Sequence, residues 1–327
     1  MKIDFIERKG RVLTISALKC LSQVASLNPT LGCVHQCVYC YARGYSMYPG
    51  DGKVFVYGNM PEKLKKELSS RRKLPAYVFF STTCDALQPI PQVLRVTYEL
   101  MEVLLEYGVG VNLLTKGRIP VKFLQLFSQY KKMVHVQIGI TTLNRDIQKR
   151  IEPYAATPQE RIRNIERLRA TGIVPEVKLD PLIPGVTDTE PNITDLFRAL
   201  QGLGVNSTGI NYLFLRPQIK KNLQKALGGT PFLPEIMRHY QNSKPMNLLA
   251  EQSRVIALGV EYRRQAYEKI SRRAGDFGIH AYVCGCKNPD ITEEPLCGEN
   301  WGRHFEKTLG QKRLFTEEFP CKNIFTE

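Results

Sequence analysis

The chain has 327 residues, of which 43% are hydrophobic and 24% are charged, as expected for a globular protein with a sizeable core. No apolar run approaches the length of a membrane span, and the first ten residues lack the apolar core of an export signal. The net charge of +15 favours polyanionic partners, chiefly nucleic acid, although simple solubility would explain the same balance.

The sequence holds nine cysteines. In a chain without an apparent export signal, this number favours metal binding over disulfides. We therefore expect a cytoplasmic protein that works in a reducing compartment and has no association with a membrane.

Strand-like and helix-like segments alternate from residue 24 to residue 215, in about six β–α units. Such alternation predicts parallel strands joined by crossover helices, and hence an α/β fold of the partial (β/α)6 TIM-type barrel class with chemistry at the carboxyl ends of the strands. The expected strands are Val24–Leu27, Tyr77–Thr82, Gly110–Thr115, Val134–Thr141, Ile173–Leu179 and Ser207–Leu215. The expected helices are Val93–Tyr107, Ile119–Tyr130, Pro158–Thr171 and Thr189–Leu203.

Pro, Gly and Asn concentrate in Leu227–Pro234 and Asn242–Asn247, which indicates a boundary. Glu251–Phe277 reads as one long basic helix, and a cysteine-rich tail follows it. We therefore divide the chain into a barrel with an N-terminal extension (residues 1–225) and a small Cys-rich C-terminal module (residues 226–327).

Three cysteines, Cys33, Cys37 and Cys40, follow the first predicted strand with the spacing C-x3-C-x2-C. One short loop can present three thiolates to a 4Fe–4S cluster, which leaves one iron open for an exogenous molecule. A zinc site would need a fourth ligand, and His35, between the first two cysteines, is poorly placed to supply it.

This spacing, with Tyr39 directly before the last cysteine, resembles the signature of radical S-adenosylmethionine (SAM) enzymes. The resemblance implies that the open iron binds the amino and carboxylate groups of SAM. It also implies that reductive cleavage of SAM yields a 5′-deoxyadenosyl radical, with Tyr39 near the adenine. A reductase or a ferredoxin- or flavodoxin-type protein would then supply the electron.

Further motifs occur in order at successive strand ends, and together they resemble the spore photoproduct lyase-like branch of the superfamily. They are Ser81–Pro89, Leu114–Lys116, Ile140–Leu143, Ile151–Pro153 and Pro181–Gly185. The resemblance covers residues 24–215 and implies a lyase-like enzyme of DNA repair or base modification.

The same motifs supply candidate contacts to SAM, each with a plainer alternative. Ser81, Thr82 and Asp85 would accept hydrogen bonds from the amino group of SAM, or Asp85 would simply form a turn. Lys116 would hold the carboxylate, or be solvated. The resemblance places the adenine against backbone near Pro184. Thr141 and Thr142 would bond the ribose, or cap the next helix.

Cys84 is a candidate catalytic residue, because a thiol can give a hydrogen atom to a carbon radical. In the lyases the corresponding cysteine lies about two residues upstream, where this chain has Thr82. The alternative is a small buried residue.

Four later cysteines, Cys284, Cys286, Cys297 and Cys321, would close a second 4Fe–4S cluster or a zinc site. Alternatively they are scattered thiols.

The overall function also has alternatives: modification of a peptide or small metabolite, or a non-catalytic metal-containing nucleic-acid-binding protein. Basic segments with tyrosines such as Tyr262 and Tyr267 could bind nucleic acid, or form ordinary solvated helix faces. The oligomeric state stays open.

Overall fold

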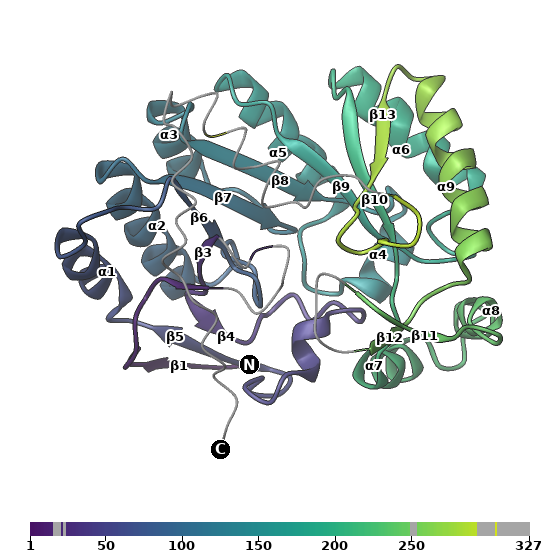
Figure 1. Cartoon of the computed structure of the whole chain (residues 1–327), viewed down its shortest axis with the longest axis horizontal. Helices are drawn as coiled ribbons and strands as arrows, with labels where there is room; N and C mark the ends of the chain where they lie inside the picture. Colours follow the sequence, from purple (N-terminus) through teal and green to yellow (C-terminus); the bar gives the residue numbers. More distant parts are fainter. Residues whose placement is uncertain (16–20, 22–23, 249–253, 293–304, 306–327) are drawn as a thin grey trace.

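The computed structural model describes residues 1–15, 21, 24–248, 254–292 and 305. Its centre is an eight-stranded sheet with the order β13-β10-β9-β8-β7-β6-β3-β2 (Figure 1). All neighbours pair parallel except β2 and β3, which pair antiparallel. The strands of this sheet are β2 Thr14–Ile15, β3 Ala25–Leu27, β6 Tyr77–Phe80, β7 Gly110–Thr115, β8 Val134–Gly139, β9 Glu176–Leu182, β10 Ser207–Tyr212 and β13 His280–Val283.

Crossover helices connect the parallel strands, as the predicted partial barrel requires. They are α2 Pro91–Glu106, α3 Val121–Gln129, α4 Arg145–Ile151, α5 Pro158–Ala170, α6 Glu190–Gly202, α7 Pro217–Leu227, α8 Phe232–His239 and α9 Val260–Gly275. Local sequence fixes some helix starts: Thr157 and Glu160 form a reciprocal capping box at the start of α5, with Pro158 in its first turn.

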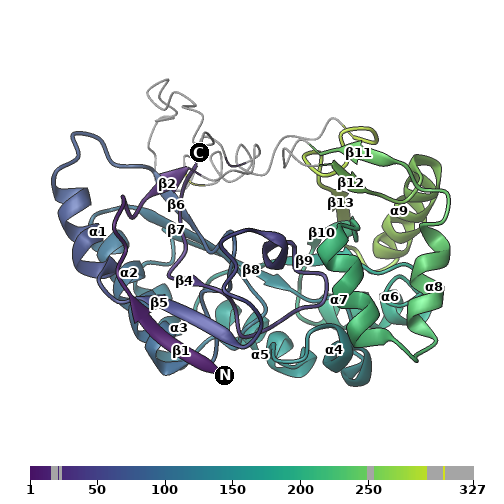
Figure 2. The same ribbon diagram turned by 90° about the horizontal axis from the view of Figure 1, so that it is seen from below.

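Two small sheets flank the main one (Figure 2). The first has the order β1-β5-β4 and lies beside helix α1 Met60–Ser69; its strands are β1 Lys2–Ile6, β4 Thr30–Leu31 and β5 Lys53–Tyr57. The second is the antiparallel pair β11 Pro245–Asn247 and β12 Arg254–Ile256. Strand β4 leads directly into the cysteine loop.

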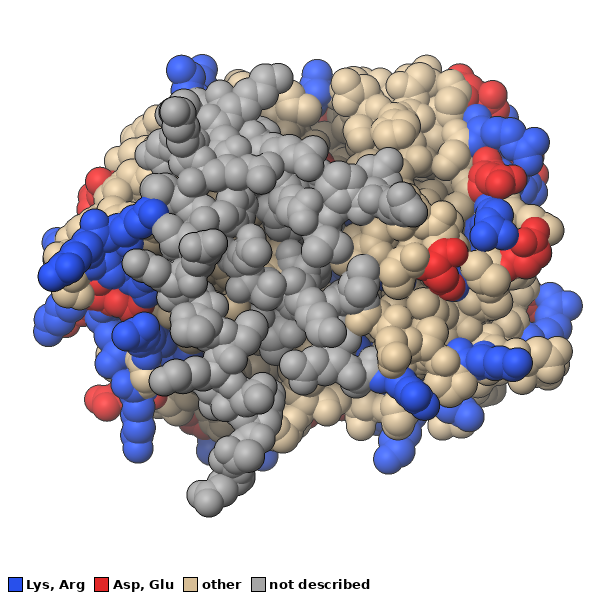
Figure 3. All heavy atoms as spheres, viewed as in Figure 1, with Lys and Arg blue, Asp and Glu red and all other residues tan. Residues whose placement is uncertain are grey.

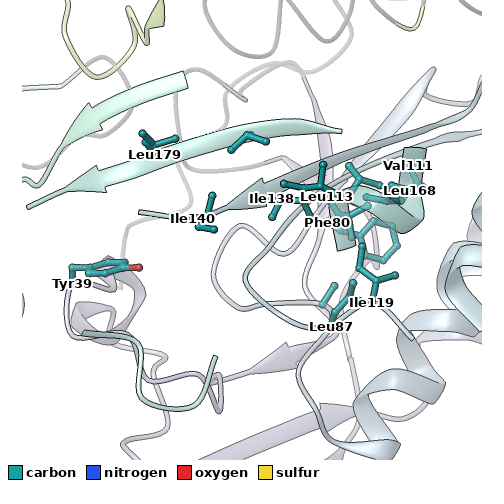
Figure 4. Packing of buried hydrophobic residues seen from close by; sticks show 14 of the residues in the cluster. Tyr39, Phe80, Leu87, Val111, Leu113, Ile119, Ile138, Ile140, Leu168 and Leu179 are labelled. Carbon is teal, nitrogen blue, oxygen red and sulfur yellow. The ribbon is translucent and has the colours of Figure 1, made fainter. Parts of the chain in front are cut away.

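The two faces of the main sheet differ in chemistry. On one face Val111, Leu113 and Ile138 are fully buried and pack with Ile119 and with Leu168 of α5 (Figure 4). The residues that alternate with these on the other face are largely polar, among them Asn112, Gln137, Lys178 and Asn211. A buried polar row needs hydrogen-bond partners or a ligand, so this face points to function.

Several sequence-based boundaries were wrong. Helices α7 and α8 were not predicted: α7 begins two residues after the predicted end of the sixth strand, and α8 begins within the Leu227–Pro234 stretch. The long helix expected over 251–277 begins only at Val260, after strand β12. Strand β9 begins at Glu176, three residues later than the start predicted for it at Ile173.

The division at residue 225 stays a prediction, but the later residues contact the barrel closely. Strand β13 extends the main sheet beside β10, α9 packs on α6, and Phe305 stacks on Tyr77 of β6 at 4.6 Å. Among the described helices, none has both the length and the apolarity to cross a membrane.

Candidate active site

One cavity of about 310 Å³ opens at the carboxyl ends of the parallel strands. Cys33, Cys37 and Cys40 all line it. Gly32 starts their loop with φ +81°, and a Cβ there would lie 2.5 Å from the carbonyl oxygen of Lys53, so the turn requires glycine. We call the three cysteines together with Tyr39 the cysteine wall.

The chemistry of the cysteine wall fits an iron–sulfur cluster. Among the described residues, no three Cys, His, Asp or Glu side chains converge as ligands of a single ion would. A cubane binds each thiolate at a different iron, and three cysteines on the lining of one cavity are placed to hold it in this way.

Burial keeps these thiols protonated in the cluster-free protein. Burial raises the pKa of Cys37 to about 12 and also raises the pKa values of Cys33 and Cys40. Cluster loading therefore has to displace three protons, and it becomes easier as pH rises.

A buried ion pair anchors Tyr39. The Tyr39 hydroxyl donates to Glu152, whose other carboxylate oxygen pairs with Arg161. Both charged side chains are 1% exposed, and Arg161 also donates to the carbonyl oxygens of Ala156 and Gly139. Although burial alone would raise the pKa of Glu152, the charges of Arg161 and Lys116 hold it below its ordinary value. In this structure the Glu-Pro motif anchors Tyr39 through the Glu152 carboxylate, which pairs with Arg161 of α5.

In this structure the carboxylate of Asp85 joins neighbouring segments by hydrogen bonds. Its carboxylate accepts hydrogen bonds from Thr115 Oγ1 and from the backbone N–H groups of Leu87 and Lys116, each at 2.8 Å. His35 Nδ1 lies 3.3 Å away. Burial would raise the pKa of Asp85, but His35 and these hydrogen bonds lower it to about 2. The predicted role with the amino group of SAM stays a prediction, since this carboxylate already has four partners.

The other candidates, which directly follow β6 and β7, also line the cavity. Ser81, Thr82, Cys84 and Lys116 line it, and the backbone of Ser81 has φ +65°, a conformation that concentrates at functional sites. Lys116 Nζ lies 5.6 Å from the ring centroid of Tyr39 and 3.4 Å from the carbonyl oxygen of Asp180. Burial raises the pKa of Cys84, which keeps its thiol hydrogen in place.

Three candidates lie off the cavity lining. Thr142 Oγ1 accepts from the N–H of Asn144, which itself caps α4, so the capping alternative describes this threonine better than a ribose contact. Thr141 is 1% exposed, and its hydroxyl has no partner among the described residues. Pro184 belongs to the turn after β9, where the N–H of Gly185 donates to Asp188.

The later cysteines divide into two groups. Cys284 and Cys286 follow β13, are buried and line the same cavity, with their sulfur atoms 2.7 Å apart. Cys297 and Cys321 lie outside the described residues.

Sequence reasoning missed a second polar side of the cavity. Asp180 of β9, Asn211 of β10 and Lys287, after β13, line it, and we call these three residues the Asp180 wall. A polar residue alternating within a strongly apolar strand was the available signal, and it would have singled out Asp180 and Asn211.

A parallel partial barrel with three cysteines in the loop after its first strands defines a class of cluster-dependent enzymes. A model of the radical SAM superfamily matches residues 27–197. The chain belongs to the radical SAM superfamily of enzymes, a family that implies a 4Fe–4S cluster and SAM as cofactors.

Proteins with similar sequences include one from a phage and one from an archaeon. A Pseudomonas phage M6 protein described as a "Radical SAM Nalpha-GlyT isomerase" is 25% identical over 274 residues, which cover 82% of this chain but only 55% of that protein. An uncharacterized protein of Methanocaldococcus jannaschii is 27% identical over 195 residues, 58% of this chain and 71% of that protein.

The solved structures agree in fold. A spore photoproduct lyase variant superposes with a TM-score of 0.64 at 14% identity, covering 86% of this chain and 81% of the other. A variant with bound AdoMet and dinucleoside spore photoproduct gives a TM-score of 0.63. The fold implied by the resemblance to spore photoproduct lyases is thereby confirmed.

Proposed function

We propose that this chain cleaves SAM reductively and uses the product radical to repair or modify nucleic acid. The observation that carries the proposal is the cavity shared by Cys33, Cys37 and Cys40 and by strand-end residues such as Ser81 and Lys116. When loaded, the cluster supplies the electron that splits SAM into methionine and a 5′-deoxyadenosyl radical. The chain's own residues hold the cluster, orient SAM and limit access of water.

Individual residues take distinct roles in this proposal. Lys116 places its ammonium beside Tyr39, where a carboxylate of SAM would gain a charge-assisted hydrogen bond. Cys84 keeps its thiol hydrogen and lies on the cavity lining, so it is placed to donate a hydrogen atom to a substrate radical. A reductase or a ferredoxin- or flavodoxin-type protein would deliver the electron.

Charge and relatives support nucleic acid as the substrate. The net charge is +15, and exposed Lys65, Lys66, Arg72 and Lys73 lie on α1 and directly after it. Figure 3 shows basic side chains gathered at that edge of the molecule. The spore photoproduct lyases share the fold, and one of them was solved with a bound dinucleoside spore photoproduct.

Helix α9 offers less support for nucleic-acid binding. Arg264, Lys269 and Arg273 each pair with an acidic side chain. Tyr267 is 3% exposed and bonds inside the protein, so it cannot stack on a base. We therefore place nucleic-acid contact on the cavity side and the α1 edge.

We further propose a second metal centre at Cys284 and Cys286. Both thiols are buried and line one cavity, which would let them serve one centre, with Cys297 and Cys321 as the remaining predicted ligands. Anaerobic reconstitution would give about eight irons per chain for two cubanes, and about four after Cys284→Ala/Cys286→Ala. A zinc content of about one with four irons would assign the second site to zinc.

The decisive test compares the reconstituted wild type with Cys33→Ala/Cys37→Ala/Cys40→Ala. With dithionite and SAM, the wild type should form 5′-deoxyadenosine and the triple variant none, because the three proposed ligands of the first cluster are gone. Cys84→Ala is the matched control: a cysteine of the same cavity outside the motif, whose loss should spare cluster content and SAM cleavage. A wild type that carries the cluster but forms no 5′-deoxyadenosine would contradict the proposal. Damaged and undamaged DNA and RNA at low salt then test the substrate class.

A further inference from the structure

The Asp180 wall places a carboxylate and an ammonium side by side on the cavity lining. Lys287 Nζ pairs with Asp180 Oδ2, and Asn211 Nδ2 lies 3.4 Å from the same oxygen. Within the described part of the chain, no hydrogen bond ends on Asp180 Oδ1. The two charged side chains keep 20% and 33% of their surface exposed, so a ligand can reach both.

A buried network of hydrogen bonds orients the side chains of the Asp180 wall. Asn288, which is fully buried, donates to Asn211 Oδ1 at 2.7 Å and accepts from Arg263 Nη1 at 2.9 Å. Arg263 comes from α9, is 1% exposed and pairs with Asp290. Burying an arginine is costly unless its donors are satisfied, and here that burial fixes the orientation of Asn211.

The wall lies on other elements than the proposed ligands of the first cluster and the proposed contacts to the amino acid part of SAM. Its Lys287 directly follows Cys286 of the proposed second centre, and its Asp180 precedes the turn proposed to contact the adenine. The proposed cluster ligands and the proposed contacts to the amino acid part of SAM lie in the loop after β4 and at the ends of β6 and β7. The wall instead comes from β9, β10 and the segment after β13. In parallel α/β folds the carboxyl ends of different strands divide binding among them, so this side of the cavity is available to the substrate.

Resting on the nucleic-acid function proposed above, we propose that the Asp180 wall reads the lactam edge of a base. Lys287 donates to the ring carbonyl oxygen, and Asp180 accepts the adjacent ring N–H. Thymine, uracil, guanine and hypoxanthine present this –CO–NH– pair. Cytosine and adenine present an amino group beside a ring nitrogen that carries a lone pair, which an acceptor-only carboxylate repels.

The test measures binding of fluorescein-labelled oligonucleotide dodecamers to the anaerobically reconstituted full chain. Two matched pairs, thymidine against deoxycytidine and deoxyinosine against deoxyadenosine, each compare a lactam edge with an amino edge on the same backbone. Lithium salts suppress assembly of the inosine strand. Because phosphate contacts cancel in each ratio, the wild type should bind the lactam member about tenfold more tightly in both pairs.

Asp180→Asn supplies the specificity readout. The new amide can donate to the ring nitrogen of cytosine or adenine, so both ratios should fall to about one or reverse. Lys287→Gln keeps a donor without the charge and should weaken all four complexes while the preference persists. Asp195→Asn, an exposed carboxylate on α6 with 60% of its side chain accessible, is the matched control and should leave both ratios unchanged.

The outcomes separate this inference from the function on which it rests. Equal wild-type affinities within both pairs, or ratios that Asp180→Asn does not alter in a protein with unchanged thermal unfolding, would show that the Asp180–Lys287 pair only braces the fold. Either result overturns the base-reading role and leaves nucleic acid as substrate standing. If no dodecamer binds at low salt, both proposals fall together.

Discussion

The cysteine wall and the Asp180 wall face one cavity but are built differently. The cysteine wall comes from eight consecutive residues, Cys33–Cys40, and is braced by the fully buried charges of Glu152 and Arg161. The Asp180 wall joins residues more than 100 positions apart, and its ion pair keeps contact with solvent. The comparison teaches that the wall we assign to the cofactors is built from one short segment of the chain. The wall we assign to the substrate depends on distant segments meeting.

The largest effect on stability is expected at the brace of the cysteine wall. Arg161→Met leaves Glu152 buried without its main partner, which should lower the free energy of unfolding by about 3–5 kcal/mol. Urea unfolding of the cluster-free protein measures this. The double variant Arg161→Met/Glu152→Gln should recover much of the loss, and equal losses in the single and double variants would contradict the assignment.

An intermediate effect is expected at Asp85, with a defined pH dependence. Its pKa falls from an ordinary value of 3.8 to about 2 on folding, so the ionised form stabilises the fold. That stabilisation, about 2 kcal/mol, is fully present above pH ~4 and is lost as pH falls through ~2.

The wild type should therefore exceed Asp85→Asn in stability at neutral pH, and the difference should shrink between pH ~4 and ~2. Unfolding in urea across this range provides the measurement. A difference that does not change with pH would show that Asp85 acts through shape and not through its charge.

The smallest effect is expected at the Asp180 wall itself. Lys287 is about one-third exposed, so solvent screens its ion pair, and Lys287→Gln should change the free energy of unfolding by less than about 1 kcal/mol. A loss as large as that of Arg161→Met would erase the proposed contrast between the two walls.

Much of the fold was predictable because the strands carry strong local patterns. Tyr77–Phe80 and Gly110–Thr115 are almost continuously buried runs, and the helices between them show helical spacing, so their type and order followed from the sequence. The N-terminal sheet, α7, α8 and β13 were missed. Short strands such as Thr30–Leu31 have too few residues to show a period, and their existence depends on pairing partners.

The sequence by itself determined the superfamily and the spacing of the three cysteines that we propose as cluster ligands, because a motif within one loop is a local property of the chain. Only the tertiary structure decided that Asp85 braces His35 and that Thr142 turns away from the cavity. It also decided that Asp180, Asn211 and Lys287 meet. Each of these facts depends on which side chains the folded strands bring within hydrogen-bonding distance. The separation of two residues in the sequence does not predict that distance.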